Sequence, residues 1–219
     1  MKKNLTAILI LGFTLNVACS TASNSNQTSG NHANHASQTN STTADHANMN
    51  HAAMSHDQMQ SAPNAKNAPY DLQFVDTMIA HHQGAVEMAQ MAANQTQNAD
   101  LLRFTRQIVA DQNAEIEQMK RWREQWFKNQ PSALNMEMSG MADSMKGMDM
   151  SKLAAARDKN FDLMFVEMMI PHHDGAVIMA REALQKAEHQ ELKTLSNQII
   201  KSQQNEIGQM QEWKKQWAR

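Results

Sequence analysis

The sequence predicts an all-α protein whose ordered part is a four-helix bundle built from two tandem helical hairpins. Two observations predict this fold: an internal repeat, and apolar residues that recur with the period of a helix in both copies. Residues 70–126 align without a gap on residues 161–217 and are identical at 25 of the 57 positions. Neither hairpin can bury its apolar stripes alone, so we expect the two to pair. No strand pattern competes.

Changes in composition divide the chain into five segments. The first has a basic start and an apolar stretch too short to span a bilayer, which is typical of a signal peptide. The second contains no Leu, Ile, Val or Phe, which predicts a disordered tether. The segments are the signal peptide (1–18), the His- and Met-rich tether (19–69), the first hairpin repeat (70–129), a Met-rich linker (130–150) and the second hairpin repeat (151–219).

The start of the chain predicts export to the cell envelope, as a periplasmic protein or as an outer-membrane lipoprotein. Cys19 follows the segment LNVA, an imperfect lipobox, so acylation of Cys19 and ordinary cleavage near residues 18–22 are both open. Because the chain has one cysteine, it can form neither an intrachain disulfide nor a multi-thiolate metal cluster. The net charge of −2 gives no electrostatic footprint for nucleic acid, and a membrane is expected to be contacted only through a lipid anchor at Cys19.

A pair of adjacent histidines occurs at the same place in each repeat. On a helical wheel, His81 and His82 flank an apolar stripe centred on Met78, and Met88 falls close to this stripe. We therefore expect both imidazoles to face inward or along a seam between helices. The repeated candidate metal ligands on these two helices are Met78, His81, His82, Met88, Met169, His172, His173 and Met179.

The second helix of each repeat carries polar residues within an apolar face. Glu115 and Gln112 lie among Ile, Met and Trp side chains, with Met119 on the same face. Burying an amide without a partner costs about 1–3 kcal/mol, and an ionised carboxylate costs more. We expect the histidine pair of the partner helix to meet them. The equivalent residues in the second repeat are Glu206 and Met210.

Two interpretations of these polar core residues compete. In the first, they form a network that fixes the register of the bundle. In the second, His81 or His82 and Met78 or Met88 bind a metal ion, while Glu115 either ligates it or holds the tautomer of an imidazole. The symmetric repetition of histidine, glutamate and methionine favours the metal site. Gly84 and Gly175 sit inside helices beside the histidine pairs, where glycine costs about 1 kcal/mol relative to alanine, which predicts a close approach of another helix at both.

Histidine and methionine also recur outside the repeats. The tether has a histidine at every fifth position between residues 46 and 56, with a methionine three residues beyond each. The linker has methionines in MxM and MxxM spacings. These linker methionines have few apolar neighbours in the sequence, which argues against a role in filling the core. An inert spacer or a sacrificial oxidation sink is the alternative. Neutral thioethers favour Cu(I) and, by analogy, silver, whereas imidazole also accepts Cu(II). These candidate ligands are His46, Met49, His51, Met54, His56 and Met59 in the tether, and Met136, Met138, Met141, Met145, Met148 and Met150 in the linker.

The segments FVDTMIAHHQGAVEMAQMA and FVEMMIPHHDGAVIMAREA are each followed by a Q-x-x-E-I-x-x-M-x-x-W segment. Over about residues 70–218, the chain resembles the domain of unknown function family 305. That family has a ferritin-like four-helix architecture and includes periplasmic copper-binding proteins of the CopM type. The resemblance implies copper binding in the cell envelope, through the methionines and histidine pairs named above for both repeats. Ala80 stands where the family pattern has proline before the first pair.

Three functions are weighed. The first is a non-catalytic copper-binding protein for sequestration, tolerance or delivery, with copper ions and other envelope copper-handling proteins as partners. The second is a ferritin-like dinuclear metal oxidase, and the third is an envelope interaction module without a metal. Di-iron bundles use four glutamates and two Glu-x-x-His elements, whereas each hairpin here has one evident core glutamate. This shortage of carboxylates favours binding over O₂ chemistry.

Overall fold

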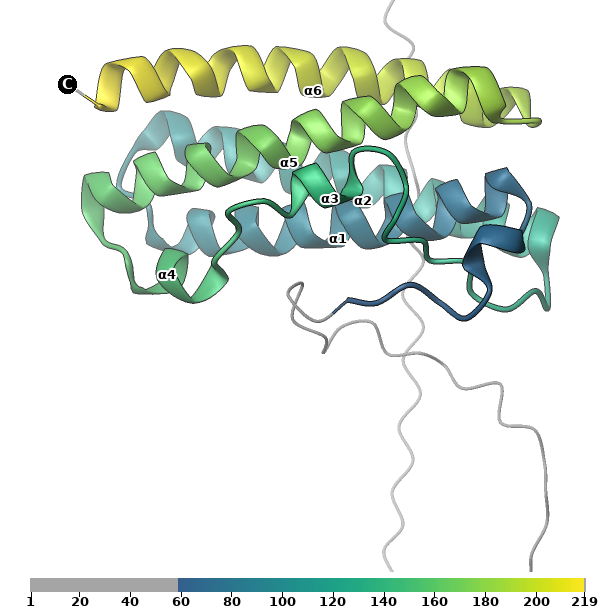
Figure 1. Ribbon diagram of the computed structural model, residues 1–219. Coiled ribbons are helices and arrows are strands. Elements are labelled where there is room, and N and C mark those ends of the chain that lie inside the picture. The colour runs from purple at the N-terminus through teal and green to yellow at the C-terminus, as the bar shows by residue number, and fades with distance from the viewer. Residues whose placement is uncertain (1–58, 219) are drawn as a thin grey trace, which may run out of the picture. The chain divides into compact units, whose positions relative to one another are not determined.

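The computed structural model describes residues 59–218, and the regular secondary structure in this part of the chain is all helical (Figure 1). No strand occurs between residues 59 and 218, so the all-α prediction is confirmed. The predicted signal peptide, Cys19 and the tether histidines His46, His51 and His56 lie outside the described residues. The four long helices are α1 (Tyr70–Gln95), α2 (Ala99–Phe127), α5 (Asp158–Lys186) and α6 (Gln190–Trp217), and the short ones are η3 (Ala65–Asn67), α3 (Met141–Ser144) and α4 (Met150–Ala155).

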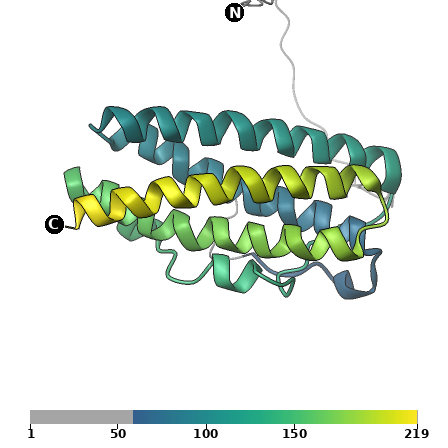
Figure 2. The same ribbon diagram turned by 90° about the horizontal axis from the view of Figure 1, so that it is seen from above.

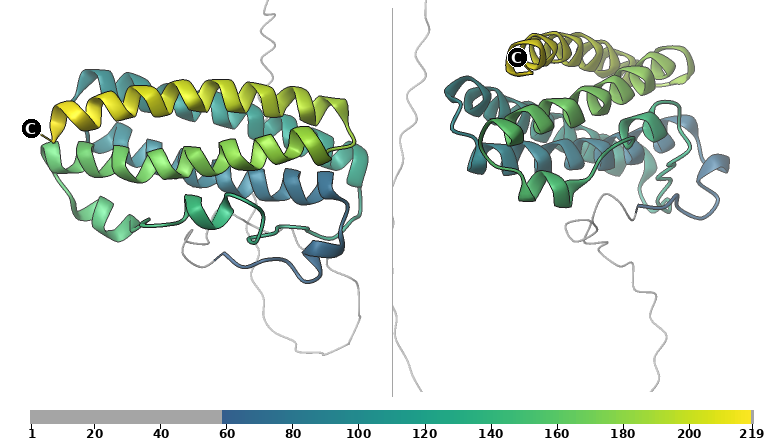
Figure 3. Two further views of the ribbon diagram at one scale, coloured as in Figure 1. Left: turned by 45° about the horizontal axis from the view of Figure 1, so that its top comes forward. Right: turned by 60° about the vertical axis from the view of Figure 1, so that its left-hand side comes forward.

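The long helices form the predicted bundle of two hairpins. Helix α1 packs along α2, and α5 packs along α6. The two hairpins meet mainly along α1 and α5, and Figures 2 and 3 show the four helices running side by side. Three or so residues connect the helices of each hairpin, and Asn98 caps α2 by accepting the backbone N–H groups of Asp100 and Leu101. Such short connections favour antiparallel neighbours.

The core consists of two apolar clusters that the repeat relates to each other. One contains Phe74 and Met78 from the first repeat together with Met179 from the second. The other contains their equivalents, Phe165, Met169 and Met88. Each cluster thus takes residues from both hairpins. Because neither hairpin completes a cluster by itself, the core forms only when the two pack together.

The linker between the hairpins is fastened to the bundle. The backbone N–H of Ala133 donates to the Asp76 carboxylate at 2.7 Å, and that of Asn135 donates to the hydroxyl of Thr77 at 2.9 Å. Met138 and Met141 are buried in the same apolar cluster as Phe74 and Met179. The prediction that the linker methionines have little apolar company is therefore wrong for these two, because the linker itself covers an open face of the bundle. It is also wrong for Met136, Met148 and Met150, which are partly buried against the core clusters.

The linker approaches α5 closely at Gly175. A Cβ atom on Gly175 would lie 2.4 Å from the Cβ of Ser144 and 2.5 Å from the carbonyl oxygen of Gly140. Gly140 itself has a φ of +87°, a conformation that glycine adopts without strain. The predicted close approach is confirmed at Gly175, although the neighbour is the short helix α3 and not a second bundle helix (Figure 3). None of the helices between residues 59 and 218 is long and apolar enough to span a membrane.

Candidate metal centre

Four buried imidazoles form a row through the middle of the bundle. Each histidine pair lies on the core-facing side of α1 or α5, and no ring is more than 1% exposed. The rings of His81 and His172 meet across the interface of the hairpins, with centroids 3.8 Å apart. The centroids of His81 and His82 are 6.1 Å apart, and those of His172 and His173 are 6.3 Å apart. The prediction that the imidazoles face inward is confirmed.

A carboxylate stands at each end of this row. Oε2 of Glu115 lies 2.7 Å from Nε2 of His82, and Oε2 of Glu206 lies 2.8 Å from Nε2 of His173. The expected contact between the glutamate of each hairpin and its histidine pair is therefore confirmed, and both glutamates are half-buried. The same expectation is wrong for Gln112, which is buried but whose side-chain atoms have no hydrogen-bond partner among residues 59–218.

A carboxylate selects the tautomer of one outer histidine. Because a carboxylate only accepts hydrogen bonds, Nε2 of His82, which is hydrogen-bonded to Glu115, carries the proton and the lone pair resides on Nδ1. Nε2 of His173 lies 2.8 Å from Oε2 of Glu206 but makes no hydrogen bond to a described residue. Both Nδ1 atoms are buried and have no hydrogen-bond partner within the described part of the chain. A buried nitrogen without a hydrogen-bond partner costs about 1–3 kcal/mol, so binding of a ligand at these two atoms would remove that cost.

Six methionines are conserved between the two repeats and completely buried. They divide into two sets of three, one in each apolar cluster, and each set combines both hairpins. Their thioethers are part of a packed core, as methionine often is. The sets are Met78, Met119 and Met179 in one cluster, and Met169, Met210 and Met88 in the other.

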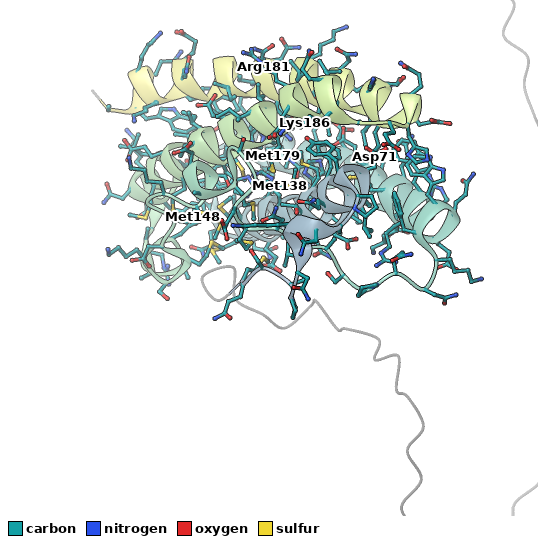
Figure 4. All side chains as sticks on the ribbon, turned by 45° about the vertical axis from the view of Figure 1, so that its right-hand side comes forward. Asp71, Met138, Met148, Met179, Arg181 and Lys186 are labelled. Carbon is teal, nitrogen blue, oxygen red and sulfur yellow. The ribbon has the colours of Figure 1, made fainter. Side chains whose placement is uncertain are left out.

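The linker methionines border these clusters. Met136 packs against the cluster of Met78, whereas Met148 and Met150 pack against the cluster of Met169. These three side chains and those of Met145 and Met59 are half-buried and thus reachable from solvent. Figure 4 labels Met138, Met148 and Met179 and shows sulfur atoms gathered around them.

The predicted ligand residues are therefore only partly brought together. Between residues 59 and 218, no three His, Cys, Asp or Glu side chains gather closely enough to hold a metal ion. Histidine and glutamate form two separate pairs, and buried methionines lie on the same helices as the histidines. The tether ligands His46, Met49, His51, Met54 and His56 lie outside the described residues.

Sequence reasoning did not identify a second polar cluster at one end of the bundle. Asp71 is 3% exposed and accepts the backbone N–H groups of Glu188 and His189. Its Oδ2 also lies 2.6 Å from Nδ1 of His189, whose ring stacks on Trp126 with a centroid distance of 3.8 Å. His189 lies in a turn, outside the helical period, so no pattern in the sequence predicts this contact.

Comparison with known proteins adds to this geometry. The sequence profile of the Domain of unknown function (DUF305) matches residues 20–123 and 71–214, which together cover most of the chain. The chain belongs to this family. CopM in its Cu(I)-bound form is 39% identical, with a TM-score of 0.58 over 67% of this chain and 96% of CopM. The predicted family resemblance is confirmed.

Two further structures support the same relationship. CopM in its Cu(II)-bound form is 40% identical, with a TM-score of 0.59 over 67% of this chain and 97% of CopM. A DUF305 protein from Streptomyces coelicolor, described as secreted, is 26% identical, with a TM-score of 0.62 over 68% of this chain and 94% of its own. A search of curated protein sequences finds no match. The similarity thus connects this DUF305 chain to a metal-related function in the cell envelope.

Proposed function

We propose that this protein binds copper in the cell envelope, with Cu(I) as the preferred ion, for sequestration, tolerance or delivery and without catalysis. The observation that carries the proposal is the pair of buried Nδ1 atoms on His82 and His173. Each ring has a glutamate oxygen within 2.8 Å of its Nε2, and each Nδ1 is left without a partner among the described residues. Metal-ligating imidazoles commonly have their other nitrogen held by a carboxylate in this way.

The surrounding donor set favours a soft ion. Thioethers are neutral and polarisable, and they suit Cu(I), and by analogy silver, better than hard ions. The buried methionines on α1 and α5 are the nearest soft ligands in sequence to each histidine pair: Met78 and Met88 on α1, and Met169 and Met179 on α5. Imidazole nitrogens also accept Cu(II), so the site is expected to bind both oxidation states. CopM has been solved with Cu(I), with Cu(II) and with silver.

The half-buried linker methionines are proposed as the entry route. Met148, Met150 and Met136 border the buried clusters and are accessible from outside. Because thioethers require no deprotonation, these side chains can capture Cu(I) even where acid protonates histidine. The ion would then pass inward to the more enclosed ligands. The His and Met positions of the tether are proposed as additional capture sites.

Glu115 and Glu206 are proposed to orient imidazoles and not to ligate copper directly. Each has one carboxylate oxygen engaged by a buried histidine. If the glutamates only orient imidazoles, the remaining donors in the core are neutral thioethers and imidazoles. Such a donor set is suited to holding a soft ion and not to activating O₂. A ferritin-like oxidase would require a cluster of carboxylates about two metal ions. We further propose export through the N-terminal signal peptide, with Cys19 as a lipid anchor.

An anaerobic Cu(I) competition titration of the chelator-stripped mature chain tests the proposal. The decisive variant replaces His82 and His173 with glutamine, whose amide can still donate to the glutamate but which lacks the second ring nitrogen. We expect weaker Cu(I) binding by this variant with unchanged helical circular dichroism. His189→Gln removes an imidazole far from the row and serves as the matched control, with unchanged copper binding expected. Equal Cu(I) affinity in the wild type and the double variant would refute the assigned ligands.

A further inference from the structure

The two ends of the bundle are related by the repeat, but only one of them holds an imidazole. At the first end, His189 stacks on Trp126 with an interplanar angle of 13° and contacts Asp71. The repeat places Asp162 and Trp217 at the equivalent positions of the other end. There Asn98 replaces the histidine. Both ends therefore have the aspartate and the tryptophan, but the second end lacks the imidazole that lies between them at the first end.

A pocket of about 280 Å³ is present at this second end. It lies where α6 terminates, beside the turn between α1 and α2 (marked C in Figure 2). Asn98 leaves the pocket open because its side chain is used to cap α2. The volume is sufficient for a five-membered ring. The lining residues are Gln97, Asn98, Asp158, Lys159, Asp162 and Trp217.

Asp162 gives the pocket an unsatisfied acceptor. The residue is 8% exposed, and the side chain of Thr96 hydrogen-bonds to its carboxyl group. Its buried Oδ1 nevertheless has no hydrogen-bond partner among residues 59–218. By contrast, the equivalent Asp71 is satisfied by two backbone N–H groups and a histidine ring. A buried carboxylate oxygen without a partner is costly, and burial raises the pKa of Asp162. Asp158 and Lys159 add opposite charges, so the lining stays net negative.

We propose that this pocket binds a histidine-type imidazolium, with its ring flat on Trp217 and one N–H donating to Oδ1 of Asp162. The contact of His189 with Trp126 and Asp71 shows that this chain builds such a cradle and what fits it. Stacking of a planar cation on indole and a charge-assisted hydrogen bond to a carboxylate both favour this ligand over a rounded ammonium ion. The pocket is separate from the histidine row and is independent of copper.

Imidazole itself is the probe for an NMR titration of the metal-free mature chain, at about pH 6, where the ring is mostly protonated. We expect saturable shifts at the indole N–H of Trp217 and the backbone N–H of Asn98, and much weaker shifts with methylammonium. Asp162→Asn should weaken binding about tenfold or more, because it removes the charged acceptor. Asp111→Asn removes the same charge on the exposed face of α2, outside the pocket lining, and is the control that should retain binding.

Asn98→His provides a second, independent variant. The new imidazole should occupy the pocket as His189 does at the other end, so added imidazole should no longer bind. A Gly-His-Gly peptide that binds more tightly than imidazole would identify a protein side chain as the occupant, and the reverse order would identify a small molecule. Absence of saturable shifts in the wild type, or equal binding by wild type and Asp162→Asn, would overturn the proposal.

Discussion

Replacing Glu115 with alanine should destabilise the bundle by about 2 kcal/mol. The His82 side chain is 0% exposed, and Glu115, at 18%, is its observed partner at 2.7 Å. Without the carboxylate, a buried ring N–H loses its acceptor, which costs about 1–3 kcal/mol. The partial exposure of Glu115 limits the loss, because some of its attraction is screened by water. For a domain of this size, the midpoint of thermal unfolding should fall by about 4–8 °C.

Urea unfolding followed by far-UV circular dichroism measures this loss directly. Glu206→Ala should cost somewhat less, since Oε2 of Glu206 lies 2.8 Å from Nε2 of His173 without the geometry of a hydrogen bond. Glu115→Gln should cost less, because an amide oxygen still accepts the ring N–H. The double alanine variant should lose the sum of the two within about 0.5 kcal/mol if the pairs are independent. A loss below about 0.5 kcal/mol in either single variant would refute the buried pairing.

Three other outcomes follow from the repeat and its asymmetries. Asp71→Asn should lower the free energy of unfolding by about 2–4 kcal/mol in urea titrations, because a buried carboxylate that accepts several hydrogen bonds is lost. Asp162→Asn should leave the free energy of unfolding unchanged or raise it. Burial raises the pKa of Asp162 in the folded protein above its pKa in the unfolded chain. The free energy of unfolding should therefore fall as the pH rises from the unfolded-state pKa through the raised folded-state pKa. This decline should be smaller in Asp162→Asn than in the wild type. Gly175→Ala should cost about 1–3 kcal/mol through its clash with α3, whereas Gly208→Ala, with open space around it, should stabilise α6 by up to about 1 kcal/mol.

The repeat explains why much of the core was predictable. Equivalent positions face the same way in both hairpins, so the inward direction of His81 and the contact of Glu115 with the histidine pair follow from helical periodicity and the need to satisfy a carboxylate within an apolar face. Periodicity does not determine how helices are rotated against each other. The pairing of Glu115 with His82, and the close contact between the tilted rings of His81 and His172, depend on that rotation.

The segments between the helices were harder to predict for a different reason. Met138 and Met141 are buried because the linker lies on α5, and that position depends on the close contact between Gly140 and Gly175. No local pattern encodes a contact between such distant residues. His189 likewise owes its role to Asp71, which is far away in sequence. From composition alone, the linker is predicted to be a methionine-rich spacer, and the burial of Met138 and Met141 in the core is not predicted.

The central claim is that copper binds through both methionine and histidine. X-ray absorption at the copper edge, measured on protein that was purified without metal and then loaded with Cu(I), tests this claim most directly. The account predicts sulfur neighbours from methionine together with at least one imidazole nitrogen, and loss of the nitrogen contribution when His82 and His173 are both replaced by glutamine. A copper environment of nitrogen and oxygen alone, without sulfur, would contradict it.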